Sequence, residues 1–213
     1  MTEQLQLTFY TADTPNGQKI SIFLEEAALS HKKVNLNLSA GDQHTADYLA
    51  INPNGKIPAI VDHAADITVF ESGAILSYLS STYGHLHPAD PKDRIAVQQW
   101  LHFQIGGIGP MLGQLWWFLH ASKTVNTEAI NRYTNEALRL YGVVDRRLAS
   151  SPFIATSLYS IADIAAFTWL RTHEELNLDI QKYRHVTLWL EQIGDRPAVK
   201  RALESLRVLV SGL

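Results

Sequence analysis

One stretch of this sequence has the residue types needed to hold a short extended peptide. The run from Asn54 to Asp62 contains Lys56, Ile57 and Pro58, followed by a short apolar segment. Proline has no backbone N–H, is tolerated where a strand begins and can follow a cis peptide bond. The backbone of Ile57 is therefore expected to be unpaired. An extended peptide can lie antiparallel to such an edge and bind it through main-chain hydrogen bonds.

A pair of polar residues, Glu71 and Ser72, stands where an expected strand over residues 67–70 gives way to a helical pattern. The Ser72 hydroxyl and the free amides of a helix start can hold a carboxylate, while Glu71 can accept an ammonium group. Each feature is also typical of ordinary structure, because Asn54 and Gly55 suit a turn and serine suits a helix cap. Together they predict a site for a peptide that presents both charges.

A third stretch is suited to binding a thiol. Thr14 and Pro15 form a natural cap and first helical residue after a strand, and the start of a helix stabilises an anion by roughly 0.3–1 kcal/mol. The Thr14 hydroxyl and the Asn16 amide can both donate to sulfur. The structural alternative is that Thr14 only caps the helix and Asn16 only forms a turn. The chemical interpretation predicts that a ligand thiol placed here ionises more readily.

The composition decides where such a thiol comes from. The 213 residues include no cysteine, which excludes disulfides, thiolate metal sites and a sulfur nucleophile supplied by the protein. His85 and His87 are the nearest approach to a metal pattern and are interpreted as linker residues, so no metal is expected. A net charge of -3 argues against nucleic acid as a partner. No apolar run suits a membrane span, and no signal peptide is expected, which predicts a cytoplasmic protein.

Hydrophobic periodicity supplies the elements that position these residues. Alternation predicts strands around residues 5–9, 34–38, 59–61 and 67–70, and helical spacing predicts helices over 14–29 and 73–82. A loop with one short helix spans residues 41–51. This order of elements predicts a thioredoxin-like α/β domain over residues 1–83, with ligands expected at the carboxyl ends of its strands.

The second half of the chain is predicted to be entirely helical. Residues 84–91 are rich in proline, glycine and histidine and are interpreted as a linker, so residues 92–213 form a helical domain. Pro110 is expected to kink the first long helix. Ser160 and Asp163 form a capping box, which assigns Asp163 to folding rather than catalysis.

These motifs resemble the cytosolic glutathione transferases, whose fold joins a thioredoxin-like domain to a helical bundle. The run from Thr14 to Ile20 resembles the first-helix motif of the Nu-class bacterial transferases and of the related fungal nitrogen-regulator prion proteins. Two later stretches, Gly107–Gln114 and Asn131–Tyr133, are also similar to Nu-class segments. The resemblance extends over nearly the whole chain.

The resemblance implies glutathione as co-substrate and a homodimer as the assembly. It assigns the sulfur to Thr14 and Asn16, with Tyr10 as a further candidate because other classes use tyrosine. It implies that Arg132 reaches the site from the other subunit. The remaining glutathione contacts implied by the resemblance are Asn16, Gln43, Lys56, Ile57, Glu71 and Ser72.

The resemblance further implies disulfide reduction, in which two glutathione molecules share one site, or reduction of an organic peroxide or conjugation to an electrophile. A glutathione-binding regulator that sequesters a partner is the alternative.

The aromatic run containing Trp116 and Trp117 departs from the relatives. Aromatic residues at helical spacing usually lie in the core. If either of these faced the second-substrate cleft, it would favour a bulky apolar substrate over a second glutathione.

Overall fold

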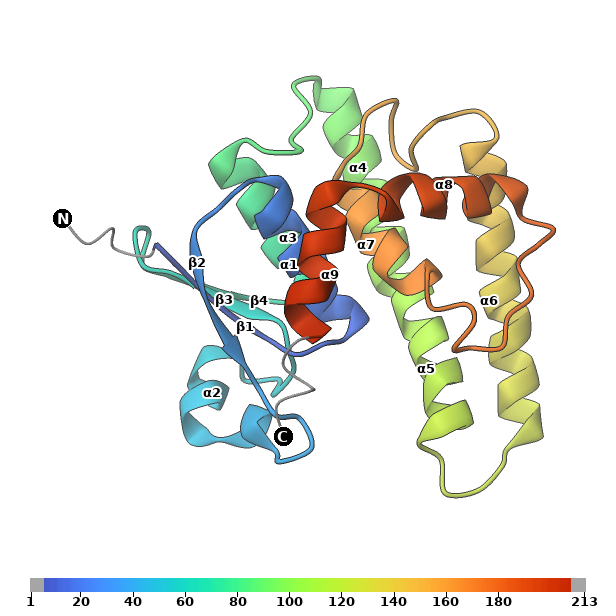
Figure 1. The fold of residues 1–213 in the computed structure, drawn as a ribbon, viewed down its shortest axis with the longest axis horizontal. Coiled ribbons are helices and arrows are strands. Elements are labelled where there is room, and N and C mark those ends of the chain that lie inside the picture. Colours follow the sequence, from blue (N-terminus) through green and yellow to red (C-terminus); the bar gives the residue numbers. More distant parts are fainter. Residues whose placement is uncertain (1–5, 208–213) are drawn as a thin grey trace. The chain divides into compact units, whose positions relative to one another are not determined.

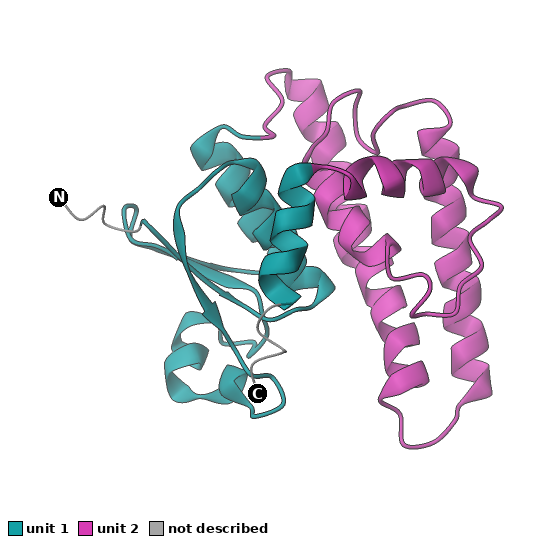
Figure 2. Cartoon of the chain, in the orientation of Figure 1, with its two compact units in different colours: residues 1–85, 197–213 teal, residues 86–196 magenta. Residues whose placement is uncertain are grey.

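The computed structural model describes residues 6–207, which form two compact units (Figure 2). Among the described residues, unit 1 holds residues 6–85 and 197–207, and unit 2 holds residues 86–196. The division after His85 falls inside the stretch 84–91 that we interpreted as a linker. None of the helices among the described residues has the length and apolar character that crossing a membrane requires.

Unit 1 is built on a four-stranded mixed sheet with the strand order β2-β1-β3-β4 (Figure 1). Strand β1 runs parallel to β2 and antiparallel to β3, and β4 is antiparallel to β3. The order of strands and helices confirms the thioredoxin-like prediction. The elements are β1 (Leu7–Thr11), α1 (Pro15–Glu26), β2 (His31–Asn35), η1 (Asp42–His44), α2 (Ala46–Ile51), β3 (Ala59–Asp62), β4 (Ile67–Phe70), α3 (Ser72–Tyr83) and α9 (Pro197–Arg207).

The core of unit 1 lies between the sheet and helices α1, α3 and α9, which share one side of the sheet, while α2 lies on the other (Figure 1). Alternating strand residues and the predicted apolar faces of α1 and α3 supply it, because burial of these side chains is the main force that holds the layers together. The fully buried members include Leu7, Phe9, Ile20, Phe23, Ile60, Ile75, Leu76 and Leu79.

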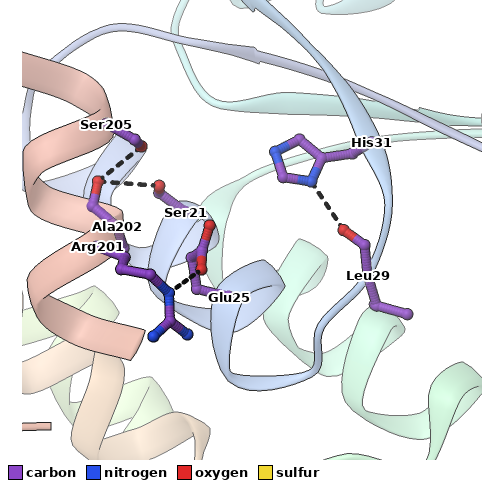
Figure 3. Close-up of polar contacts among 7 residues, drawn as sticks. All are labelled: Ser21, Glu25, Leu29, His31, Arg201, Ala202 and Ser205. Atoms are coloured by element: carbon purple, nitrogen blue, oxygen red, sulfur yellow. Dashed lines mark hydrogen bonds and ion pairs between the residues drawn. The ribbon is translucent and has the colours of Figure 1, made fainter. Parts of the chain in front are cut away.

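Helix α9 packs against α1 and so belongs to unit 1, although the sequence pattern placed it in a helical domain over residues 92–213. Figure 3 shows two of the contacts that hold it there. The Ser21 hydroxyl donates to the carbonyl of Ala202 at 3.3 Å, and Arg201 pairs with Glu25 at 2.9 Å. The difference arises because an amphipathic pattern identifies a helix and its apolar face but does not identify the surface that covers this face.

Unit 2 contains helices and no strand within residues 86–196, as predicted. Its core is formed by the apolar faces of these helices, with Tyr141 and Val144 of the longest helix fully buried. The elements are α4 (Pro91–Phe103), the π-helical turn η2 (Gln104–Ile108), α5 (Gly109–His120), α6 (Thr127–Leu148), α7 (Ile161–Leu170) and α8 (Arg184–Gly194).

The expected disturbance at Pro110 takes the form of the π-helical turn η2, which ends directly before α5. Proline lacks the N–H of a helical hydrogen bond, and its ring collides with the carbonyl four residues earlier, here that of Gly106. A π turn adds a residue to the helix at that point. Helices α4 and α5 therefore follow one another without a connecting loop.

Asp163 at the start of α7 is fully buried and serves the fold. Its carboxylate accepts hydrogen bonds from the backbone N–H groups of Ile154 at 2.8 Å and Ser160 at 3.0 Å, and from the Trp189 indole at 3.2 Å. Burial raises the pKa of Asp163 to about 6, although these donors act in the opposite direction. The capping box with Ser160 is confirmed.

Candidate functional site

The register of the sheet brings the predicted site segments to one edge. Tyr10 near the end of β1 pairs with Ala59 at the start of β3, and Ala59 pairs with Phe70 at the end of β4. Thr11 at the end of β1 pairs with Asn35 at the end of β2. The segments that follow β1, β2 and β4, and the one that precedes β3, therefore all leave the sheet at the same edge. We call this edge the site edge.

Helix α1 begins at the site edge with the predicted cap. The Thr14 side-chain oxygen accepts a hydrogen bond from the Gly17 N–H at 3.2 Å, and Pro15 is the first helical residue. A hydroxyl carries one hydrogen and two lone pairs, so the Thr14 hydrogen is not used by this bond. Asn16 follows as the second helical residue and is half-buried.

Gly17 is required for the tight approach of α1 to the end of β1. A Cβ atom at this position would lie 2.2 Å from the carbonyl oxygen of Ala12 and 2.5 Å from the Thr11 hydroxyl. Both distances are far shorter than a van der Waals contact, and one of the two atoms belongs to the backbone. The glycine thus fixes how closely the start of α1 follows the loop that leaves β1.

The turn before β3 is organised by two buried polar side chains. The Asn52 amide and the Tyr48 hydroxyl each donate to the Lys56 carbonyl at 2.6 Å. The Asn52 side-chain oxygen also accepts from the Asn54 N–H at 3.0 Å. Gly55 has a φ of 61°, a conformation that glycine adopts without steric cost. The turn is therefore held from inside and leaves the Lys56 side chain exposed.

Ile57 follows this turn and presents the unpaired backbone that the sequence predicts. Within residues 6–207, no hydrogen bond uses its N–H or its carbonyl group. The Ile57–Pro58 peptide bond is cis, and Pro58 itself is buried. Both polar groups of Ile57 are thus available to a peptide backbone, which is the requirement for the strand-addition mode of recognition.

Gln43 lies in η1, which packs against the same turn. A Cβ atom added to Gly55 would lie 3.2 Å from the Gln43 carbonyl oxygen, so the two segments are in direct contact. The Gln43 side chain donates to the Leu38 carbonyl at 3.3 Å. Its own amide oxygen is buried and accepts no hydrogen bond from the described part of the chain.

Helix α3 begins at the site edge with Glu71 as its N-cap and Ser72 as its first residue. Glu71 has φ 71° and ψ 117°, which is an unfavourable conformation for a residue with a side chain. Such backbone strain costs on the order of 1–3 kcal/mol and is concentrated at functional sites. The Glu71 side chain is exposed, whereas Ser72 is buried. The sequence pattern predicted Ser72 itself as a possible cap, but Ser72 lies one residue further into the helix.

Lys19 is a site residue that the sequence analysis missed. It is 1% exposed, and its ammonium group donates to the Ser72 hydroxyl oxygen at 3.1 Å. Burial lowers the pKa of Lys19 to about 7, and the negative charge of Glu71 partly opposes this shift. Lysine is almost never fully buried, which is why it escaped notice. The available signal was its spacing, because Lys19 and Phe23 are four residues apart on the apolar side of α1.

Arg132, Trp116 and Trp117 lie in unit 2. Arg132 is exposed on α6. The hydrogen bond from Arg139 lowers the pKa of the neighbouring Glu136, and the charge of Arg132 adds to this effect. Trp116 and Trp117 are 40% and 46% exposed, so the interpretation as core residues is wrong for both. The Trp116 indole donates to Glu175 at 2.6 Å. Helical spacing alone misled here because α5 has a buried face, which contains Leu112 and Leu115, and an exposed face that is also aromatic.

Tyr10 lies on β1 and is half-buried, with its ring centroid 5.8 Å from that of Tyr48. This contact places it beside Tyr48, whose hydroxyl donates to the turn before β3. Among residues 6–207, the structure contains no group of three or more His, Cys, Asp or Glu side chains placed to bind a metal ion.

Comparison with known proteins gives two family matches in the same chain. Residues 5–81 match the glutathione S-transferase N-terminal domain, and residues 110–197 match the glutathione S-transferase C-terminal domain. The disulfide-bond oxidoreductase YfcG of Escherichia coli is 45% identical over 202 residues, covering 92% of this chain and 94% of YfcG.

Two solved structures extend the comparison to the fold. A glutathione transferase from Burkholderia graminis, with two glutathione molecules bound per subunit, is 40% identical with a TM-score of 0.91, covering 96% of this chain and 90% of that one. A glutathione transferase from Pseudomonas putida, with one glutathione disulfide bound per subunit, is 38% identical with a TM-score of 0.90, covering 95% and 93%.

Proposed function

We propose that this chain, which belongs to the glutathione S-transferase family, binds glutathione at the site edge and uses its thiolate to reduce disulfides. The proposal rests on the meeting of four segments at that edge. They are the start of α1, the segment containing Gln43, the turn before Ile57 and the start of α3. Each offers a group that matches a different part of the tripeptide.

The peptide part of glutathione suits Ile57. Its free N–H and carbonyl can pair with the cysteinyl backbone of the ligand in the manner of an added strand. Lys56 stands next to it with an exposed ammonium group that can pair with the glycyl carboxylate. The main-chain oxygen of Gln43 contacts the same turn, and its side-chain amide oxygen has no hydrogen-bond donor among the described residues, so we include Gln43 among the ligand contacts.

The γ-glutamyl end carries both a carboxylate and an ammonium group, which suits the start of α3. The Ser72 hydroxyl and the free backbone amides of the helix start can bind the carboxylate. The exposed Glu71 side chain can accept from the ammonium group. The strained backbone of Glu71 gives this side chain a direction that a relaxed helix cap would not give.

The sulfur is then expected at the start of α1. The Thr14 hydrogen and the Asn16 amide can both donate to a thiolate, and the helix N-terminus stabilises the same negative charge. The protein has no cysteine to share this role. We therefore assign Thr14 and Asn16 as the catalytic residues, which lower the proton affinity of the bound thiol without removing the proton themselves.

The reaction takes place in two exchanges. The thiolate of one glutathione attacks a sulfur of the disulfide, which forms a mixed disulfide and releases one thiolate. A second glutathione thiolate attacks the glutathione sulfur of that mixed disulfide, which forms glutathione disulfide and releases the second thiolate. Two thiols are oxidised and one disulfide is reduced, so the electrons balance. The relatives that hold two glutathione molecules or one glutathione disulfide per subunit support this scheme.

We further propose a Nu-class homodimer in the cytoplasm, in which Arg132 binds the glutathione of the partner subunit. Its exposure on α6 supports this, since an exposed guanidinium is available to a carboxylate on another chain. Trp116 and Trp117 are exposed on α5 and give unit 2 an apolar surface.

The test is the rate of reduction of a small disulfide with and without glutathione. We expect a rate well above the uncatalysed exchange that depends on glutathione and falls at least tenfold in Asn16→Ala. Lys32→Ala, an exposed substitution on β2, serves as a matched control and should not change the rate. A rate equal to the uncatalysed background would refute the enzymatic proposal. Glutathione binding without turnover would favour the regulatory alternative.

A further inference from the structure

The buried lysine of α1 is the most unusual group near the site edge. Lys19 is 1% exposed, and its ammonium group reaches the hydroxyl of the first residue of α3, 53 positions further along the chain. Burying a charged group is costly unless it is paired and hydrogen-bonded. A methionine or leucine would fill this position in α1 without that cost. The retained charge therefore calls for an explanation other than packing.

Hydrogen-bond chemistry supplies an explanation for the buried charge of Lys19. A protonated lysine has three donors and no acceptor, whereas the Ser72 hydroxyl has one hydrogen and two lone pairs. Because the ammonium of Lys19 donates to the Ser72 oxygen at 3.1 Å, the Ser72 hydrogen has to point to another acceptor. Neutral Lys19 would instead have a lone pair and could accept that hydrogen. The protonation state of Lys19 thus sets the direction of the Ser72 hydroxyl.

We infer that Lys19 is a positioning residue for anion binding, which turns the Ser72 hydroxyl and the positive end of α3 toward the carboxylate of the γ-glutamyl group. This inference rests on the proposed glutathione site. Lys19 itself acts through Ser72 and need not touch the ligand. The charge of Lys19 adds to the partial positive charge of the α3 N-terminus. The effect of that partial charge is confined to the first helical turn.

The charged surroundings of Lys19 support a proton-linked role. Burial brings its pKa to about 7, and Glu71 at the start of α3 opposes the shift. On α9, the other helix packed against α1, Arg201 is paired with Glu25 further along α1. The remaining ionisable groups of α9 and β1 are Lys200, Glu204, Arg207 and Tyr10.

A carboxylate bound near Lys19 favours its protonated form, so binding should take up a proton when the pH lies above the pKa of the free lysine. The probe is S-methylglutathione, because it lacks an ionisable thiol. We expect its affinity for the wild-type protein to fall about tenfold between pH 6.5 and 8.5. Calorimetry at pH 8 in two buffers of different ionisation enthalpy should show proton uptake.

Lys19→Met removes the charge while keeping a flexible side chain of similar length. We expect it to weaken S-methylglutathione binding about tenfold at pH 6.5 and to remove most of the pH dependence. Adding Ser72→Ala to this variant should cost less affinity than Ser72→Ala costs in the wild type. The matched control is Lys33→Met on β2, where a half-buried lysine donates to the Ser205 carbonyl at 2.6 Å. It should bind like the wild type.

The outcomes separate the two proposals. Failure of the wild-type protein to bind S-methylglutathione would overturn the glutathione site and this inference with it. Binding that is independent of pH and takes up no proton would overturn the role of Lys19 alone, and this measurement needs no variant. Wild-type affinity and pH dependence in a folded Lys19→Met protein would also overturn it.

Discussion

Substitution of Thr14 separates two roles that one hydroxyl is expected to play. The side-chain oxygen caps α1 by accepting from the Gly17 N–H at 3.2 Å, and the hydrogen is free to donate to a bound thiolate. Thr14→Ala removes both functions. Loss of an N-cap costs about 0.5–2 kcal/mol of stability. Loss of a hydrogen bond to a charged group costs roughly 1.5–3 kcal/mol, which corresponds to an increase of about 1–2 units in the pKa of the bound thiol.

Thr14→Asp distinguishes the two roles, because aspartate caps a helix as well as threonine does. Its stability should therefore stay close to that of the wild type. Its carboxylate would lie beside the sulfur, and two like charges about 4 Å apart repel by about 4 kcal/mol at an effective dielectric constant of about 20. The pKa of the bound thiol should therefore rise by more than it does in Thr14→Ala. Thr14→Ser keeps the hydroxyl and serves as the control.

Two measurements check the prediction on each variant. Chemical denaturation gives the free energy of unfolding, and the ultraviolet absorbance of the thiolate, followed against pH at saturating glutathione, gives the pKa of the bound thiol. We expect stability to fall only in Thr14→Ala and the thiol pKa to rise in both Thr14→Ala and Thr14→Asp. A thiol pKa that is the same in all four proteins would show that Thr14 only caps α1, and the assignment of the sulfur to this helix start would be refuted.

Three further predictions concern residues that support the local structure, two of them at the site edge and one in unit 2. Gly17→Ala should destabilise the protein by at least about 3 kcal/mol in denaturant unfolding, because its Cβ would lie 2.2 Å from a backbone oxygen; unchanged stability would contradict the close approach of α1. Tyr48→Phe removes one of two donors to the Lys56 carbonyl and should raise the KM for glutathione about fivefold with little effect on kcat; a fall in kcat alone would contradict this. Asp163 has a folded-state pKa of about 6, above the unfolded value of 3.8, so the folded state binds the extra proton and stability rises as the pH falls through 6. Relative to Asp163→Asn, the wild type should gain about 1 kcal/mol between pH 7 and pH 5; a loss over that range would show that the hydrogen bonds to Asp163 outweigh its burial.

Local patterns predicted most of the fold because they report local physics. Thr14 and Pro15 together define a helix start, and both the cap and the first helical residue are where the sequence placed them. The hairpin of β3 and β4 and the capping box of Asp163 were likewise predicted from short-range signals. The capped start of α1 and the unpaired backbone of Ile57 were accordingly the parts of the candidate site whose local structure could be predicted from sequence.

The features that sequence could not supply depend on contacts between distant segments. Nothing in the pattern of α9 specifies that its apolar face meets α1. The pairing of Lys19 with Ser72 spans 53 positions and depends on the placement of two helices. The exposure of Trp116 and Trp117 depends on how much of α5 its neighbours cover. Long-range packing decides all three, and hydrophobic periodicity identifies only the face of each helix that is buried.

The start of α3 concentrates two features that lower stability. Glu71 has a strained backbone at φ 71°, and the neighbouring Ser72 holds the ammonium group of a fully buried lysine. Strain of this kind costs on the order of 1–3 kcal/mol, and a buried charge adds a desolvation cost. A helix start selected only for stability would avoid both, since a serine or aspartate cap in a relaxed conformation is available to any sequence. In the proposed complex, the ammonium group of the ligand pairs with Glu71 and its carboxylate binds at Ser72 near the charge of Lys19, and these contacts offset both costs. If the proposed glutathione site is correct, the start of α3 is organised for the bound state rather than for the free protein.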